Sequence, residues 1–274
     1  MFSKITGFVS SLTDGTFVRF KNREKAAVTL YSIIKEHLKN TNKKKVLVLG
    51  IPRGGIIMAH TIAHRVGCKF DFIIPSRLVA PHNQELTIGA IMNDHKTAHL
   101  NSILIETLKI EKDYLNQERE NKIVEINERI KKYLELEDQE IAINDTANDT
   151  ANGVSDLIIN NQYLFKYKDN CQMIILVDEG IYSGASMIVA VRWIIENLRP
   201  SKIIVGATVT PKEIISLIKN ETNKDVVIVE AIMTPPISKF KTVGRSYQDF
   251  MPVDDQKVIE ILRSRKQVDV QGLT

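Results

Sequence analysis

An acidic pair followed by small residues is the clearest candidate for chemistry in this sequence. Residues 173–186 read MIILVDEGIYSGAS, so five apolar residues lead directly into Asp178 and Glu179. Carboxylates at the edge of a core are costly unless something binds them. The run therefore predicts a buried strand whose carboxyl end carries a binding site.

The residues after the acidic pair favour a phosphate as part of the ligand. Ser183, Gly184, Ala185 and Ser186 are small, leave their backbone N–H groups uncovered and lead into an expected helix. Unpaired N–H groups and the helix dipole both favour an anion at a helix N-terminus. Because two acids would repel that anion, they are expected to bind hydroxyl groups or a metal ion beside it. A sugar phosphate satisfies both demands.

A second glycine-rich turn, GIPRGG, follows an earlier apolar run and contains Arg53, Gly54 and Gly55. Ligands of open parallel sheets bind beyond the carboxyl ends of the strands, where both turns are expected to lie. No lysine follows Gly55 or Gly184 as a Walker A motif requires, and GIPRGG does not match the dinucleotide fingerprint GxGxxG. A phosphoacceptor receiver domain would explain the acids but neither small-residue turn. The remaining alternative is structural, with Asp178 as a helix cap and the glycines as turn residues.

The elements around these turns predict an α/β fold with an open, mainly parallel twisted sheet and helices on both faces. Short apolar runs, typical of buried strands, alternate with segments of helical periodicity. Strands are expected at residues 46–49, 70–74, 173–177, 202–209 and 226–232, and helices at 22–38, 56–66, 185–198, 212–219 and 254–263.

Other segments surround this core, and a single domain over residues 1–274 is expected. Residues 76–103 predict a mobile arm, with a hairpin between 85–92 and 99–103. Residues 111–136 carry one apolar stripe on a highly charged helix. Residues 137–162 contain NDTANDTAN and predict a polar surface insertion, and residues 233–274 predict a C-terminal hood or tail.

Composition narrows the function further. The chain has 274 residues, 43% hydrophobic and 26% charged, which suits one sizeable globular core. A net charge of +4 is too balanced to indicate a nucleic-acid surface. No apolar run reaches the roughly 18 residues of a membrane span and no signal peptide is evident, so a cytoplasmic protein is expected. Cys68 and Cys171 lie in no CxxC motif, so the sequence suggests neither a disulfide framework nor a thiolate metal site. A homo-oligomer is compatible with the sequence.

These motifs resemble those of a known enzyme family. The run VDEGIYSGAS is similar to the phosphoribosyl-pyrophosphate (PRPP) signature of type I phosphoribosyltransferases, in which an apolar strand leads into two acids and a Thr/Ser-Gly-x-Thr/Ser loop. The chain also resembles a bacterial and archaeal group of phosphoribosyltransferase-like proteins of undefined substrate. The shared motifs are PRGG at residues 52–55, SRLVAPHNQELTIGA at 76–90 and YQDF at 247–250.

The resemblance implies a role for each matching residue around the ribose. Asp178 and Glu179 would bind the 2′- and 3′-hydroxyls and be catalytic, and Gly180 would let the chain turn. The 5′-phosphate would be held by the loop that follows, which comprises Ser183, Gly184, Ala185 and Ser186. Tyr247 and Phe250 would either form a hood over the acceptor base or pack locally.

The resemblance also implies how pyrophosphate would be held. Arg53, Gly54 and Gly55 would form its binding loop, which in such enzymes often carries a cis peptide. Arg77 stands where the group has a lysine on the arm, and it would be the catalytic cation on the leaving group.

The implied reaction transfers phosphoribose from PRPP to a nitrogenous, nucleobase-like acceptor and releases pyrophosphate. PRPP and this small acceptor would therefore be the partners. Mg²⁺ would be the cofactor, held by Asp178 and Glu179 indirectly through ligand or water. Loss of pyrophosphate leaves an oxocarbenium-like centre, so catalysis is expected from cations on the leaving group and from a fixed sugar. Two alternatives stay open: a PRPP-binding sensor without turnover, and a phosphatase or phosphorylase acting on a related sugar phosphate.

Overall fold

The computed structural model describes residues 19–138 and 159–265, which divide into two compact units. The first unit contains the residues up to Phe72, with Gln172–Gly184 and Ser201–Asp254. The second contains Ile73–Cys171, Ala185–Pro200 and the residues from Asp255 onward. The expected single domain over residues 1–274 stays a prediction.

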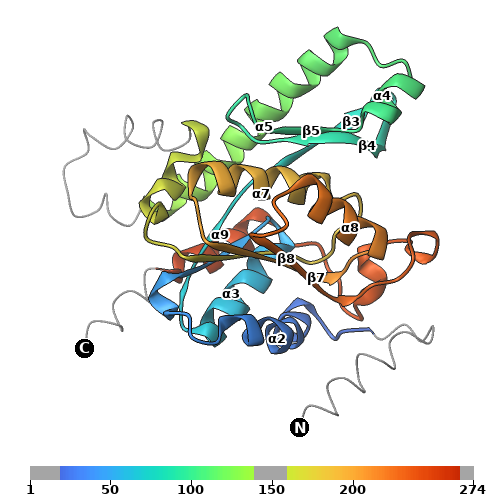
Figure 1. Ribbon diagram of the computed structural model, residues 1–274. Helices are drawn as coiled ribbons and strands as arrows, with labels where there is room; N and C mark the ends of the chain where they lie inside the picture. The colour runs from blue at the N-terminus through green and yellow to red at the C-terminus, as the bar shows by residue number, and fades with distance from the viewer. Residues whose placement is uncertain (1–18, 139–158, 266–274) are drawn as a thin grey trace, which may run out of the picture. The chain divides into compact units, whose positions relative to one another are not determined.

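The first unit is built on a five-stranded parallel sheet (Figure 1). Its strands, in spatial order, are β2 (Lys69–Phe72), β1 (Val46–Gly50), β6 (Met173–Asp178), β7 (Lys202–Val209) and β8 (Val227–Met233). Every neighbouring pair is parallel, with β1 beside β6 at the centre. The carboxyl ends of the strands therefore share one edge, where open α/β sheets bind ligands.

The strands are buried because their sequences are nearly continuous apolar runs. Strand β1 is buried at every residue, and β7 is buried at all but its first. Runs of this kind are typical of strands with both faces covered.

Three helices of the first unit pack against the sheet, α2 (Arg23–Ile34), α3 (Gly54–Val66) and α8 (Lys212–Glu221). Helix α2 begins after Asn22, whose side chain accepts a hydrogen bond from the Lys25 N–H as an N-cap. Helices α2 and α3, blue and cyan in Figure 1, also pack against each other. The first residue of α2 and the turn before α3 are thereby held beside the sheet.

The second unit contains a three-stranded antiparallel sheet of β3 (Ser76–Ala80), β4 (Asn83–Ile91) and β5 (Ala98–Leu100). Its helices are α4 (Ser102–Thr107), α5 (Lys112–Asp138), α7 (Ala185–Asn197) and α9 (Asp255–Arg263), with a 3₁₀ segment at Ile159–Tyr167. The Tyr133 hydroxyl donates to Asp255 Oδ1 over 2.9 Å and so joins α5 to α9.

The predicted fold class is confirmed: a mainly parallel sheet with helices around it, and a smaller antiparallel sheet. The predicted hairpin corresponds to β4 and β5, whereas β3 and α4 were not predicted as elements. Most of the predicted insertion, residues 139–158, lies outside the described residues. Within the described ranges, no helix has both the length and the apolar character needed to cross a bilayer.

Candidate functional site

The acidic pair lies where the central strand β6 ends. The strand is buried from Met173 to Val177, and Asp178 and Glu179 follow at its carboxyl end, both half-buried. The Glu179 N–H donates to Asp178 Oδ1 over 2.7 Å, which fixes the first carboxylate at the turn. A Cβ on Gly180 would lie 2.6 Å from Val243 Cγ1, so the chain can pass this point only without a side chain.

The surroundings of Asp178 disfavour the charged form of its carboxyl. The pKa of its carboxyl is raised well above its ordinary value, first because burial disfavours the charged form and second because Glu179 is negative. The N–H of Glu179 and the charge of Arg23 oppose that rise. A hydroxyl donor or a cation bound here would favour the ionised carboxylate.

The structure brings the PRGG turn against this acidic pair. A Cβ on Gly54 would lie 1.6 Å from Glu179 Oε2, and one on Gly55 would lie 2.8 Å from the Val177 carbonyl oxygen. At Gly55 the clash is with the backbone, so that position requires glycine, whereas a side chain at Gly54 would have to displace the end of the Glu179 side chain. The peptide bond between Pro52 and Arg53 is cis, which agrees with the expectation drawn from the resemblance, and Arg53 is exposed.

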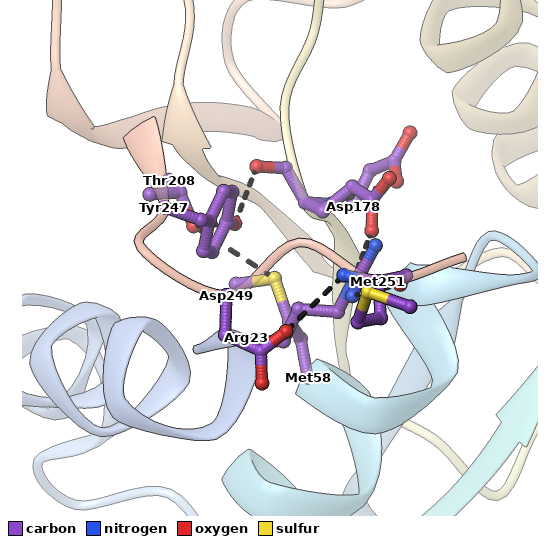
Figure 2. Close-up of polar contacts among 8 residues, drawn as sticks. Arg23, Met58, Asp178, Thr208, Tyr247, Asp249 and Met251 are labelled. Carbon is purple, nitrogen blue, oxygen red and sulfur yellow. Dashed lines mark hydrogen bonds and ion pairs between the residues drawn. The ribbon is translucent and has the colours of Figure 1, made fainter. Parts of the chain in front are cut away.

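Arg23, the first residue of α2, is a site residue that the motifs did not reveal. Its Nε lies 2.5 Å from Glu179 Oε2, and its Nη1 donates to the Met251 carbonyl over 3.0 Å (Figure 2). The guanidinium carbon lies 4.2 Å from the centre of the Phe250 ring, and the residue is only 7% exposed. Sequence reasoning recognised the helix from its apolar spacing, but nothing local to Arg23 indicates a partner 156 positions away.

Tyr247 lies on the other side of the acidic pair. Its hydroxyl donates to the Glu179 carbonyl over 2.8 Å and lies 2.6 Å from the Thr208 hydroxyl oxygen (Figure 2). Its ring stacks on Phe250, with centroids 5.0 Å apart. Burial raises the pKa of the phenol above its ordinary value, so the hydroxyl stays a donor. These contacts show that Tyr247 and Phe250 pack locally. A role for them over an acceptor base stays a prediction.

The segment that contains Tyr247 is paired with the chain just before α2. The Phe20 N–H donates to the Ser246 carbonyl over 2.8 Å, and the Gln248 N–H donates to the Phe20 carbonyl over 2.7 Å. One further bond runs from the Asp249 N–H to the Lys21 carbonyl. We call residues 246–251 the C-terminal strap.

Residues 180–182 connect the acidic pair to the predicted phosphate loop at residues 183–186. The Ile181 N–H donates to the Val209 carbonyl over 2.9 Å, which fixes this connection to the end of β7. Gly184 has φ +78°, a left-handed conformation that favours glycine, immediately before α7 begins. Tyr182 is 56% exposed, and its ring centroid lies 5.6 Å from that of Phe240.

Three of the predicted site residues belong to the second unit. Ala185 and Ser186 are the first residues of α7, directly after Gly184 in the chain, and Arg77 is an exposed residue of β3. Their predicted contacts with phosphate and pyrophosphate stay predictions.

The acidic pair offers carboxylate oxygens to a metal ion, and Mg²⁺ at this place stays a prediction. In the described ranges, no group of three His, Cys, Asp or Glu side chains is placed to hold a metal ion. Mg²⁺ is usually bound through one or two carboxylates together with substrate phosphates and water. Asp178 and Glu179 provide the hard oxygen donors that such a site needs, so the residues present fit Mg²⁺.

The chain is similar to two proteins of Mycobacterium tuberculosis, from strains CDC 1551 and H37Rv. Both carry the name "Putative phosphoribosyl transferase", and each is 21% identical to this chain over 227 residues. The match covers 83% of this chain but 43% of each relative, so the chain spans less than half the length of the curated relatives it matches. No protein family model matches the sequence.

A solved structure shares the fold. The protein TT1426 from Thermus thermophilus is 23% identical, with a TM-score of 0.54 over 90% of this chain and 99% of that one. At this level of identity the likeness concerns the fold alone. The chain is thus related in sequence to proteins named as phosphoribosyl transferases, as its motifs predict, and it shares the α/β fold of TT1426.

Proposed function

We propose that this protein transfers phosphoribose from PRPP to a nitrogenous, nucleobase-like acceptor and releases pyrophosphate. One observation supports this most: Asp178 and Glu179 at the end of β6 lie against the glycines of the PRGG turn. Carboxylates that can accept hydrogen bonds from sugar hydroxyls thus lie beside two glycines, whose backbone can approach phosphate groups closely. The relatives named as phosphoribosyl transferases support the same class of reaction.

In this proposal the protein's own residues bind and orient the sugar. Asp178 and Glu179 accept hydrogen bonds from the ribose hydroxyls, and the small loop at residues 183–186 offers its N–H groups to the 5′-phosphate. The PRGG turn and Arg77 bind the pyrophosphate, whose negative charge grows as the bond to C1 breaks. Mg²⁺, when bound, would neutralise part of that charge through the oxygens of the ligand. The acceptor nitrogen enters from the face opposite to the leaving group.

Calorimetric titration with PRPP and Mg²⁺ tests the binding half of the proposal. We expect the double variant D178N/E179Q to bind PRPP at least about 100-fold more weakly, because a hydrogen bond to a charged group contributes about 1.5 kcal/mol or more. The matched control is E24Q/D225N, which removes two exposed acids of the same unit and should bind normally. Equal affinity of the acidic-pair variant and the wild type would contradict the assignment.

A screen of nucleobases for pyrophosphate release tests the transfer half. Release that requires PRPP, Mg²⁺ and one particular base is the expected result. PRPP binding without release in the presence of any base would instead support a sensor. Release of phosphate from ribose phosphates without a base would support a phosphatase or phosphorylase.

A further inference from the structure

The Arg23 side chain lies where three separate parts of the first unit meet. Its Nε is paired with Glu179 of the acidic pair, and the same atom lies 2.8 Å from the position that a Gly54 Cβ would take. On its other side the guanidinium lies over Phe250 and donates to the Met251 carbonyl. One buried cation therefore contacts the ribose site, the PRGG turn and the C-terminal strap.

The ion pair defines the place of the second acid. The bond from Arg23 occupies one acceptor position of Glu179 Oε2, and the carboxylate keeps further acceptor positions for a ligand hydroxyl. The same contact holds the carboxylate in the space that Gly54 leaves open. A buried guanidinium is costly unless it is paired, and a planar fork fixes a carboxylate more closely than a flexible ammonium would. The position of Glu179 thus depends on Arg23.

The strap depends on the same side chain. Its backbone is held at one end by the bonds between Phe20 and residues 246 and 248. At the other end Met251 is 71% exposed, and its carbonyl is held by Arg23. Stacking of Phe250 on Tyr247 joins the two ends, so movement of Arg23 affects the strap from Phe250 onward.

We infer that Arg23 is a positioning residue, which fixes the Glu179 carboxylate against the PRGG turn and couples it to the C-terminal strap. A change at the acidic pair therefore changes the order of the strap, and a change in the strap changes how tightly the acidic pair holds its ligand. The identity of that ligand, PRPP, rests on the proposed function. The coupling itself does not.

The first experiment measures the coupling without any ligand. E179Q keeps the size of the side chain and leaves the backbone carbonyl that Tyr247 binds, but it removes the charge that Arg23 pairs with. We expect amide hydrogen exchange at Asp249 and Met251 to become about tenfold faster, as for a segment whose local opening is eased. The control E24Q should leave these amides unchanged. Unchanged exchange at the strap in E179Q would overturn the inference.

The second experiment measures the coupling through PRPP affinity in the presence of Mg²⁺. F250L alters the strap but none of the acids, and we expect it to weaken binding several-fold, up to about tenfold. In an R23M background the same substitution should have no further effect, because the connection is already lost. R23K, which keeps the charge but loses the fork and the stacking surface, should lie between the wild type and R23M. K25M, which removes an exposed cation of the same helix, is the matched control.

The outcomes separate this inference from the proposed function. If PRPP binds and the effects of R23M and F250L on affinity simply add, Arg23 is a structural ion pair and the inference fails while the function stands. If PRPP does not bind to the wild type, the proposed function fails, and the exchange experiment alone decides the role of Arg23.

Discussion

Asp178 is half-buried as a residue, and its carboxyl group is the part that is removed from water, beside a second negative group. Its pKa is raised well above its ordinary value, chiefly by burial and next by Glu179. At pH values between the ordinary and the raised pKa, the folded protein therefore holds a proton there that the unfolded chain has lost. Folding stability attributable to this residue is present at low pH and falls as the pH rises through the raised pKa.

The predicted fall of stability with rising pH can be checked with D178N, whose side chain cannot ionise. As the pH rises from the ordinary carboxyl range upward, wild-type protein should lose unfolding free energy relative to D178N, by about 1.4 kcal/mol for each unit that separates the folded and unfolded pKa values. Urea unfolding at several pH values measures the difference. Parallel curves for the two proteins would show that Asp178 is not shifted in this way.

The absence of a side chain at Gly54 leaves room for the Glu179 carboxylate. A Cβ at this position would lie 1.6 Å from Glu179 Oε2, so G54A must push the carboxylate away from Arg23. We expect PRPP affinity to fall at least about tenfold, the loss of roughly one charge-assisted hydrogen bond, in a calorimetric titration.

The control for G54A is G67A at the end of α3. Gly67 has φ +75°, and a Cβ there would have its nearest neighbour at 4.0 Å, so the change strains the backbone without a clash. It should cost about 1 kcal/mol of stability and leave PRPP affinity unchanged. A G54A protein that binds PRPP as G67A does would contradict the argument.

At the scale of elements, the strap is attached to the sheet through the Tyr247 hydroxyl. Y247F removes its bond to the Glu179 carbonyl and leaves that buried acceptor without this donor. We expect a loss of about 1–3 kcal/mol of unfolding free energy in chemical denaturation. Y31F, at a half-buried tyrosine of α2, is the matched control and should be close to neutral. A Y247F protein as stable as Y31F would show that the hydroxyl contributes nothing.

Some of these elements could be predicted from the sequence and others could not. Strand β7 has the predicted bounds because a continuous apolar run forms a buried strand wherever it lies in the sheet. Strand β3 and helix α4 were not predicted, because a five-residue strand depends on its partner β4 and a six-residue helix depends on its packing.

The candidate site divides in a similar way. Asp178, Glu179 and the PRGG glycines could be found because each belongs to a local motif at a strand end. Arg23 could not, because its importance comes from partners that only the folded chain brings near. Residues that act through others leave weaker signals than residues that form a motif.

At the scale of the whole molecule, the acidic pair and Arg77 belong to different units. If Arg77 acts on the leaving pyrophosphate, R77M should lower the rate constant for pyrophosphate release at least about tenfold and by more than it lowers PRPP affinity, since the charge it meets grows in the transition state. Single-turnover kinetics measures the rate and calorimetry the affinity. K112M, an exposed cation of the same unit, is the control. An unchanged rate in R77M would remove Arg77 from the mechanism.

The chain passes between the two units five times, so each unit is assembled from separate stretches of sequence. Val46 of β1 pairs with Met173 of β6, and the strap that closes over the acidic pair comes later still. On the ribosome, β1 therefore emerges long before its central neighbour exists. Its apolar edge stays unpaired during that interval, and an unpaired edge of this kind exposes a growing chain to wrong pairing and aggregation.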